Sequence, residues 1–168
     1  MWAIMCLILV LGSNLAWAGD VWPPKGWRLP TDADYTKEWS EYRQWFPIPF
    51  HASADFNGDG LVDDVWILIG DGRDAFGLFV LLGRRNDSPR VIELFAYSEC
   101  CAQRYALALV SPGRHLTVCG RRRECFGSTP NAVTLKNPGF EFITLGMAGG
   151  LYYWSPKINA FRSVPVAD

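Results

Sequence analysis

Oxygen-bearing side chains alternate with small residues over positions 55–63 of the sequence. Asp55, Asn57, Asp59 and Asp63 occupy positions 1, 3, 5 and 9 of this stretch, and hard oxygen ligands at that spacing can converge on one Ca²⁺ ion. The carbonyl of Leu61, at position 7, would supply a further oxygen. Two carboxylates about 4 Å apart repel by about 4 kcal/mol at an effective dielectric near 20. We therefore expect calcium binding and the order of this loop to be coupled.

The segments around the loop differ from those of an EF-hand. The twelfth position is Trp66 and not the bidentate Glu that an EF-hand requires. Pro47 and Pro49 argue against a helix that enters the loop. The apolar, β-branched run 64–69 that follows is typical of a strand. We therefore predict that the calcium loop connects two extended segments.

The D-x-N-x-D-G-x-x-D run with its following strand resembles the calcium loop of FG-GAP or VCBS-type repeats. The resemblance implies a loop between strands, with Asp55, Asn57, Asp59, the Leu61 carbonyl and Asp63 as ligands. In that family the loop belongs to a β-propeller. The sequence contains one such loop and no second copy, so a propeller of several blades is not expected.

A wider resemblance links the chain to a group of small exported bacterial proteins with a single loop of this kind. The residues that carry it are 28–31, the loop itself, 151–154 and 161–162. This resemblance implies export and a shared fold, and it implies no particular function.

Residues 1–18 are apolar, contain no Lys or Arg and end in Ala-Trp-Ala before Gly19. This pattern predicts a signal peptide that is cleaved after Ala18. An uncleaved anchor is the alternative, but the run is shorter than the roughly 20 residues of a membrane-spanning helix. We expect residues 19–168 to form one periplasmic or secreted domain without a transmembrane segment. The net charge of −1 gives no global attraction to nucleic acid.

Four cysteines follow the predicted signal peptide, and an even number in an exported chain favours disulfide bonds. Cys100 and Cys101 are adjacent, and a bond between them would close a strained ring. We therefore expect each to bond one of Cys119 and Cys125. The alternative is a zinc site with four thiolates, but the usual pair of C-x₂₋₄-C knuckles is missing. Two bridges of about 2–4 kcal/mol each would stabilise the middle of the domain.

The remaining patterns predict a mainly β fold that verges on α+β, with antiparallel sheets and one amphipathic helix. Aromatic residues at three- and four-residue intervals, after a possible capping box at Thr31, predict the helix over 32–45. Two strands, 65–69 and 76–82, should form a hairpin around a Gly- and Asp-rich turn. Further strands are expected at 91–97, 105–110, 115–119, 132–136, 140–145, 151–154 and 160–164.

The sequence shows little catalytic machinery. His51 and His115 are its only histidines, and it contains no G-x-S-x-G, S-x-x-K or H-E-x-x-H motif. We interpret both histidines as structural or merely exposed. We also interpret the calcium as structural, because a catalytic metal needs an open coordination position beside a base or a substrate pocket. These observations favour a protein that is not an enzyme.

Two features are candidates for partner binding. Arg121, Arg122 and Arg123 form the one concentrated basic run, which could hold an acidic partner through bidentate contacts or could simply be a solvated turn. Trp154 ends an aromatic strand segment, 152–154, whose side chains alternate between the two faces of a sheet. Exposed Trp and Tyr side chains are typical anchors of protein interfaces and also stack on sugars.

Together these patterns predict an exported, calcium-stabilised binding domain. The expected partner is a protein of the cell envelope, which the domain would inhibit or neutralise as an immunity protein does. A small envelope hydrolase that uses Asp or Glu is the alternative from another functional class. A cell-wall glycan-binding module is the third possibility.

Overall fold

The structure is a computed structural model of the 168-residue chain. It describes residues 22–166 except 35, 36, 44, 46, 73, 86, 99, 100, 123, 124, 126 and 148. The predicted signal peptide and Arg123 lie outside the described residues, so those predictions are untested, and Cys100 also lies outside them. Among the described residues, no helix has both the length and the apolar character needed to cross a membrane.

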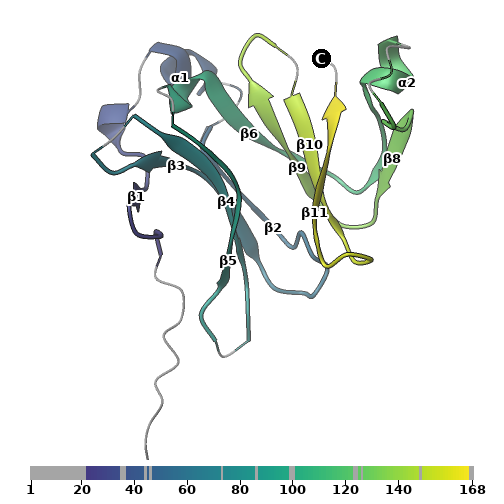
Figure 1. Cartoon of the computed structure of the whole chain (residues 1–168), viewed down its shortest axis with the longest axis horizontal. Coiled ribbons are helices and arrows are strands. Elements are labelled where there is room, and N and C mark those ends of the chain that lie inside the picture. The colour runs from purple at the N-terminus through teal and green to yellow at the C-terminus, as the bar shows by residue number, and fades with distance from the viewer. Residues whose placement is uncertain are drawn as a thin grey trace, which may run out of the picture.

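Two antiparallel sheets pack against each other with the main core between them (Figure 1). The mainly β, antiparallel class predicted from the sequence is therefore confirmed. The first sheet has the order β1-β3-β4-β5, and β2 also pairs with β3. Its strands are β1 (Trp27–Arg28), β2 (His51–Ala54), β3 (Asp63–Gly70), β4 (Phe76–Leu82) and β5 (Arg90–Tyr97).

The second sheet has the order β11-β10-β9-β6. Its strands are β6 (Tyr105–Val110), β9 (Gly139–Thr144), β10 (Gly149–Ser155) and β11 (Ala160–Val166). A separate two-stranded ribbon is formed by β7 (Gly113–Leu116) and β8 (Ala132–Leu135). The ribbon lies beside β11 at the edge of the molecule (Figure 1).

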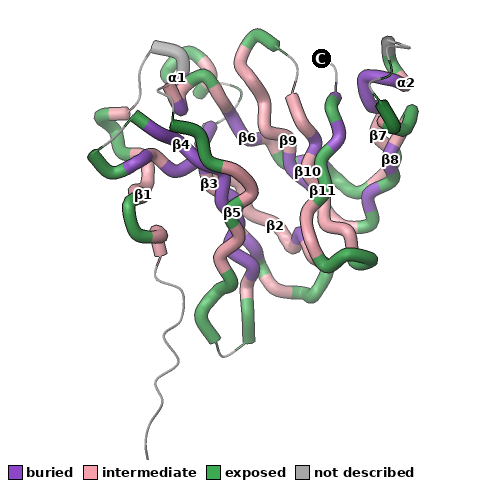
Figure 2. The backbone as a smooth tube through the Cα atoms, in the orientation of Figure 1, coloured by how far each residue is buried: buried purple, intermediate pink, exposed green. Residues whose placement is uncertain are grey.

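Side chains at alternate positions along the strands form the core between the two sheets. Val65 and Ile67 of β3 are buried in the same cluster as Leu78 and Val80 of β4, and Phe140 joins them from the second sheet. Side chains two residues apart share one face of a strand, so these residues point between the sheets. Figure 2 shows the resulting runs of buried residues along the central strands.

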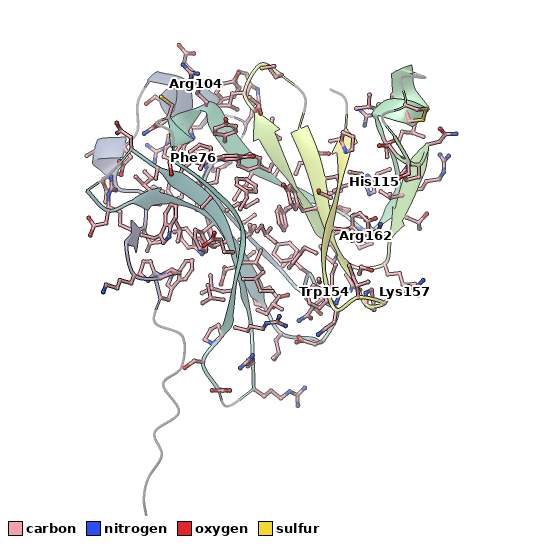
Figure 3. All side chains as sticks on the ribbon, viewed as in Figure 1. Phe76, Arg104, His115, Trp154, Lys157 and Arg162 are labelled. Atoms are coloured by element: carbon pink, nitrogen blue, oxygen red, sulfur yellow. A yellow bond between two sulfur atoms is a disulfide. The ribbon has the colours of Figure 1, made fainter. Side chains whose placement is uncertain are left out.

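β4 is buried along its whole length, because both of its faces are covered. On the side away from the main core, the ring of Trp27 lies 5.1 Å from that of Phe79 in an edge-to-face contact. On the core side, the ring of Phe76 lies 4.7 Å from that of Tyr105 of the second sheet (Figure 3). A strand that is buried on both faces is expected to have a continuous run of apolar residues in its sequence, and β4 has such a run.

The hairpin predicted for 65–69 and 76–82 is confirmed. β3 and β4 pair antiparallel from Asp64 opposite Leu81 to Ile69 opposite Phe76. The turn between them contains Gly72 at φ 67°, a left-handed conformation that glycine adopts without a Cβ penalty.

Two predicted elements differ from the structure. In place of one helix over 32–45 there is a 3₁₀ turn, Asp32–Asp34, and a six-residue helix α1 (Lys37–Tyr42), so the long amphipathic helix is not shown. Trp39 of α1 is buried, and its indole N–H donates to the carbonyl of Tyr105 at 2.8 Å. A further 3₁₀ turn, Ala102–Arg104, precedes β6.

The strand predicted for 115–119 is wrong in its second half. β7 ends at Leu116, and a short helix α2 (Val118–Arg122) begins two residues later. Thr117 explains the change of direction, because its hydroxyl donates to the Pro130 carbonyl and accepts from the Gly120 N–H at 3.4 Å. A Thr side chain that bonds the nearby backbone in this way competes with continued strand pairing.

Candidate functional site

The predicted calcium loop connects β2 to β3, as expected from its sequence. Its first carboxylate, Asp55, is turned towards the backbone of the loop. Asp55 Oδ1 accepts from the N–H groups of Gly58 at 2.7 Å and Asp59 at 3.1 Å, and Oδ2 accepts from that of Gly60 at 2.9 Å. These bonds coil the chain around one carboxylate.

Asn57 and Asp59 extend this pattern. Asn57 Oδ1 accepts from the Asp59 N–H at 2.9 Å, and Asn57 Nδ2 donates to Asp59 Oδ2 at 3.0 Å. Asp59 Oδ1 accepts from the Leu61 N–H at 2.8 Å. Gly58 and Gly60 have φ angles of 79° and 84°, which L side chains rarely adopt. The loop conformation therefore follows from short-range bonds among its own residues.

Asp63 ties the loop to the rest of the fold. Its side chain is buried, and Oδ2 accepts from the N–H groups of Phe56 at 2.9 Å and Asn57 at 3.3 Å. Oδ1 accepts from the Gly83 N–H, beyond the end of β4, at 2.8 Å. Burial raises the pKa of the Asp63 carboxyl, and these three hydrogen bonds act in the opposite direction.

Phe56 anchors the loop in the core. It is fully buried, and its ring lies 5.3 Å from that of Phe140 and 6.3 Å from that of Phe161, both in edge-to-face contacts. The loop is thus held by a core aromatic ring at one end and by a buried carboxylate at the other. Its backbone has little freedom to move as a unit away from the sheets.

The donors of the loop are chemically suited to a calcium ion. Asp55, Asn57 and Asp59 offer only oxygen ligands, and Asp55 Oδ2 and both Asp59 oxygens each accept a single hydrogen bond, so a lone pair remains on each. Asp63 is different, since three backbone N–H groups already occupy its two oxygens. Over the residues that the structure describes, no three His, Cys, Asp or Glu side chains are clustered as metal ligands. The calcium site stays a prediction.

A cleft of about 390 Å³ lies against the loop. Three segments that are far apart in the sequence form its walls: the loop, the connection from β8 to β9, and the end of β10. Trp154, a predicted partner-binding residue, is thereby brought beside the calcium loop. The lining residues are Phe56, Asn57, Gly58, Thr134, Leu135, Lys136, Asn137, Tyr153, Trp154, Ser155 and Pro156.

The loop and the opposite wall of the cleft are in direct contact. Asn137 Nδ2 donates to the Phe56 carbonyl at 3.4 Å. A Cβ atom at Gly58 would lie 2.5 Å from Asn137 Nδ2, so only glycine permits this approach. The shape of the cleft therefore depends on the conformation of the loop.

Sequence reasoning missed most of this cleft. Lys136 and Asn137 follow β8 in a turn that carries no motif, and Thr134 is one exposed position of a short strand. Only the alternation of the aromatic run 152–154 pointed towards Trp154. The three segments that form the walls of the cleft come together because the two sheets pack against each other. No pattern of neighbouring residues in the sequence predicts this packing.

Arg121, the one residue of the predicted arginine cluster whose side chain is described, does not line the cleft. Arg121 lies on α2 and is exposed, Arg123 lies outside the described residues, and so does the side chain of Arg122. Arg114, on β7, lines a separate cavity of about 330 Å³ together with Cys119 and Cys125. Two distinct surfaces thus carry the residues that the sequence suggested for partner binding.

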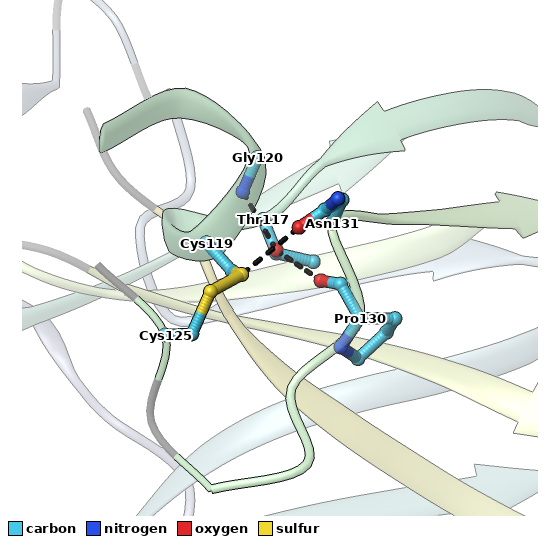
Figure 4. Close-up of a disulfide and its surroundings, with 6 residues drawn as sticks. All are labelled: Thr117, Cys119, Gly120, Cys125, Pro130 and Asn131. Carbon is cyan, nitrogen blue, oxygen red and sulfur yellow. Dashed lines mark hydrogen bonds between the residues drawn. A yellow bond between two sulfur atoms is a disulfide. The ribbon is translucent and has the colours of Figure 1, made fainter. Parts of the chain in front are cut away.

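The predicted disulfide pairing is wrong for Cys119 and Cys125. These two residues bond each other (Figure 4), so neither is left for Cys101. They are six residues apart, and α2 reverses the chain between them so that their Cα atoms lie 4.4 Å apart. The sequence prediction follows from excluding a bond between the adjacent Cys100 and Cys101, and no local pattern indicates the short helix that brings Cys119 and Cys125 together.

A serine, a histidine and an aspartate meet on β2 and β3. His51 Nε2 lies 2.8 Å from Asp64 Oδ1 and 3.1 Å from Ser53 Oγ, and Ser53 also donates to Asp64. A catalytic relay needs the serine and the carboxylate on opposite ring nitrogens. Here both contact the same nitrogen, so the arrangement is a hydrogen-bonded surface cluster and not a triad.

The imidazole of His51 also stacks on Trp66, with ring centroids 3.9 Å apart. His115 Nε2 lies 2.8 Å from the Ser111 carbonyl. Both histidines therefore have hydrogen-bond partners within the fold.

A larger cavity of about 580 Å³ lies at the other end of β3, lined by Arg28, Asp34, Asp74 and Gln103 among others. Its two strongest polar groups are already paired, because Arg28 donates to both oxygens of Asp34 at 2.7 Å. A ligand would have to compete with this ion pair.

Comparisons with known proteins found no match: no family model, no curated protein and no solved structure is significantly similar to this chain. The resemblance to FG-GAP and VCBS-type loops thus depends on residues 55–63 and the strand that follows them.

Proposed function

We propose that this protein is an exported, calcium-stabilised binding domain that recognises a protein partner of the cell envelope through the cleft beside its loop. The observation that carries the proposal is the position of Trp154, which lines one cavity together with Asn57 and Gly58 of the loop. Connections at one end of a rigid sheet scaffold are a common location for binding residues. Trp in such a position is a frequent anchor of protein interfaces.

Calcium has a structural role in this proposal. Asp55, Asn57 and Asp59, with the Leu61 carbonyl, would hold the ion, and Asp63 would position the start and end of the loop. Bound calcium would supply positive charge that neutralises the acidic loop, and it would favour the conformation in which Asn57 and Gly58 line the cleft. Affinities of about 10⁻⁴–10⁻³ M are typical of extracellular calcium modules, and calcium in the cell envelope is high enough to keep such a site filled, so we expect a structural site and not a calcium sensor.

Binding is favoured over catalysis by the geometry of the polar clusters. The Ser53–His51–Asp64 arrangement lacks the order of a relay. Among the described residues that line the cleft, the polar groups are one ammonium group, amides and hydroxyls, with no carboxylate pair that could act as acid and base. These features support an inhibitor or immunity-like role more than a hydrolase.

The test is capture of an envelope protein on the immobilised domain in the presence of calcium. We expect one specific protein to be retained by the wild type and lost by the Lys136→Glu variant. Lys25→Glu, an exposed charge reversal outside the cleft, is the matched control and should retain it. Turnover of peptidoglycan or a glycoside by the purified domain would contradict the proposal.

A further inference from the structure

The charged side chain that lines the cleft beside the loop is positive. Of the residues that line it, Lys136 is the one whose side chain is charged at neutral pH, and it is exposed. The other polar groups are the amides of Asn57 and Asn137 and the hydroxyls of Thr134, Tyr153 and Ser155. A ligand of negative charge would therefore meet no repelling carboxylate on these walls.

Two further cations lie at the same end of the molecule. Lys157 follows Trp154 by three residues, and Arg162 lies on the neighbouring strand β11 (Figure 3). Lys157 belongs to the turn between β10 and β11, and Arg162 pairs with Tyr153 across these two strands. Both residues are exposed. Lys136 is the cation of the cleft itself, and these two exposed cations outside it would add to the attraction of an acidic partner.

The acidic side chains of the loop do not line the cleft, but without a bound cation their negative charge opposes an acidic ligand there. Asp55 and Asp59 are bonded to N–H groups of the loop itself, and neither lines the cleft. The loop contributes only Phe56, Asn57 and Gly58 to the cleft walls. A cation bound by the loop carboxylates would make the whole region more positive.

The rim of the cleft favours a polypeptide over a saccharide. Ile158 is 56% exposed, and it belongs to the same turn as the cleft residue Pro156. A protein interface buries aliphatic side chains of this kind around an aromatic anchor, whereas a sugar stacked on Trp154 would leave them in water. The volume of about 390 Å³ suits a short segment and not a whole domain.

We propose that the cleft binds an acidic segment of a protein partner, with an Asp or Glu side chain at Lys136 and a neighbouring apolar side chain against Trp154, and that calcium in the loop strengthens this binding. The inference deepens the proposed function and depends on it. The structural link is the contact of Asn137 with the Phe56 carbonyl and Gly58, which joins the calcium loop to the cleft wall. Coupling of this kind is reciprocal, so the acidic segment must raise the affinity for calcium by the same factor.

The experiment uses a library of short random peptides, selected on the purified protein in millimolar calcium. We expect the selected peptides to contain Asp or Glu next to an apolar residue. Binding of one selected peptide, measured by calorimetry, should weaken about tenfold or more in Lys136→Glu and remain unchanged in Lys25→Glu. Chelation of calcium should weaken it as well, and calcium titration with the peptide present should show a correspondingly higher calcium affinity.

Trp154 packs on Phe161 at 5.2 Å, so Trp154→Ala could disturb the fold. Trp154→Phe is the milder variant and should weaken peptide binding while the melting temperature stays close to that of the wild type. A neutral peptide of the same length, with Gln for Glu and Asn for Asp, should bind at least about tenfold more weakly.

Other results would overturn the inference in distinguishable ways. Peptides that bind equally with and without their carboxylates would exclude the acidic partner. Peptide binding that is unaffected by calcium would exclude the coupling and leave the binding domain intact. Chitotetraose or a hyaluronan fragment that binds with sensitivity to Lys136→Glu, while no peptide does, would assign the cleft to a glycan. Capture of an envelope protein that is insensitive to Lys136→Glu would place the proposed function on another surface.

Discussion

The two ends of β3 each have a carboxylate that organises a turn, and their environments are opposite. Near the end of β3, Asp34 accepts two hydrogen bonds from Arg28 at 2.7 Å, and it also accepts from the N–H and the hydroxyl of Thr31. Arg28 itself pairs with Ile69 of β3. The hydrogen bonds from Arg28 hold the pKa of Asp34 down to about 2.

At the start of β3, Asp63 is more deeply buried, and its three hydrogen-bond donors are backbone N–H groups without formal charge. Burial therefore dominates, and the pKa of Asp63 is raised. The comparison teaches that hydrogen bonds from the backbone alone do not offset the desolvation of this carboxylate, whereas a nearby cation does so for Asp34. A divalent cation in the adjacent loop would supply the charge that Arg28 supplies at the other end.

The largest expected effect concerns the core anchor of the loop. Phe56→Ala should lower the free energy of unfolding by about 3–5 kcal/mol, because it leaves a cavity beside Phe140 and Phe161. Urea denaturation measures the change. Leu109→Ala, at a residue that is 54% exposed, is the control and should change stability by less than about 0.5 kcal/mol. An equally small effect of Phe56→Ala would mean that the loop is not anchored in the core.

Removal of calcium is the next largest effect. If the free calcium concentration is about 100 times the dissociation constant, chelation by EGTA should cost about 2.7 kcal/mol. For a domain of this size that corresponds to a decrease in melting temperature of about 5–10 °C. The Asp59→Ala variant should melt at the same temperature with and without EGTA. Unchanged melting of the wild type, with no metal bound, would end the calcium hypothesis.

Substitution of the buried carboxylate tests its role directly. Asp63→Asn should destabilise the protein by about 2 kcal/mol, because an amide NH₂ would replace one of the two accepting oxygens and face a backbone donor. Asp74→Asn, at an exposed turn position, should be nearly neutral. Both variants are compared by chemical denaturation in EGTA, so that calcium binding does not contribute. A neutral Asp63→Asn would show that its hydrogen bonds are dispensable.

The pH dependence of the ion pair is the smallest expected effect. Because the pKa of Asp34 is about 2 in the folded protein and 3.8 without the fold, its stabilisation is present above pH about 4 and is lost as the pH falls towards 2. Solvent screening at the partly exposed Arg28 reduces it to about 1 kcal/mol. Asp34→Asn should remove this part of the acid dependence.

Asp63 should contribute to the acid dependence with the opposite sign. A carboxyl group whose pKa is raised by folding adds stability below its unfolded value and loses that stability as the pH rises through the folded value. The difference between wild type and Asp63→Asn should therefore grow, not shrink, as the pH falls from neutral towards 4. The reverse trend would contradict the contrast between the two ends of β3.

Much of the fold follows from local patterns in the sequence. The alternation of Val65, Ile67 and their neighbours specifies a strand with one face in the core, and the Gly- and Asp-rich turn after it specifies a hairpin. The loop is also local in origin, since the bonds of Asp55, Asn57 and Asp59 span five residues or fewer and use glycines at left-handed positions. These features depend on neighbours along the chain, which the sequence displays.

Only the tertiary structure decided the disulfide, the burial of Asp63 and the cleft. The Cys119–Cys125 bond depends on the helix that replaces the end of a predicted strand, and Asp63 meets Gly83 only because β3 and β4 pair in one particular register. The cleft joins Asn57, on the loop between two strands of the first sheet, and Trp154, near the end of β10 in the second sheet. The sequence by itself determined the local chemistry of the loop, because backbone geometry and hydrogen bonding act over a few residues. The packing of the two sheets decided what lies beside the loop, because contacts between distant segments depend on the sum of many weak interactions across the core.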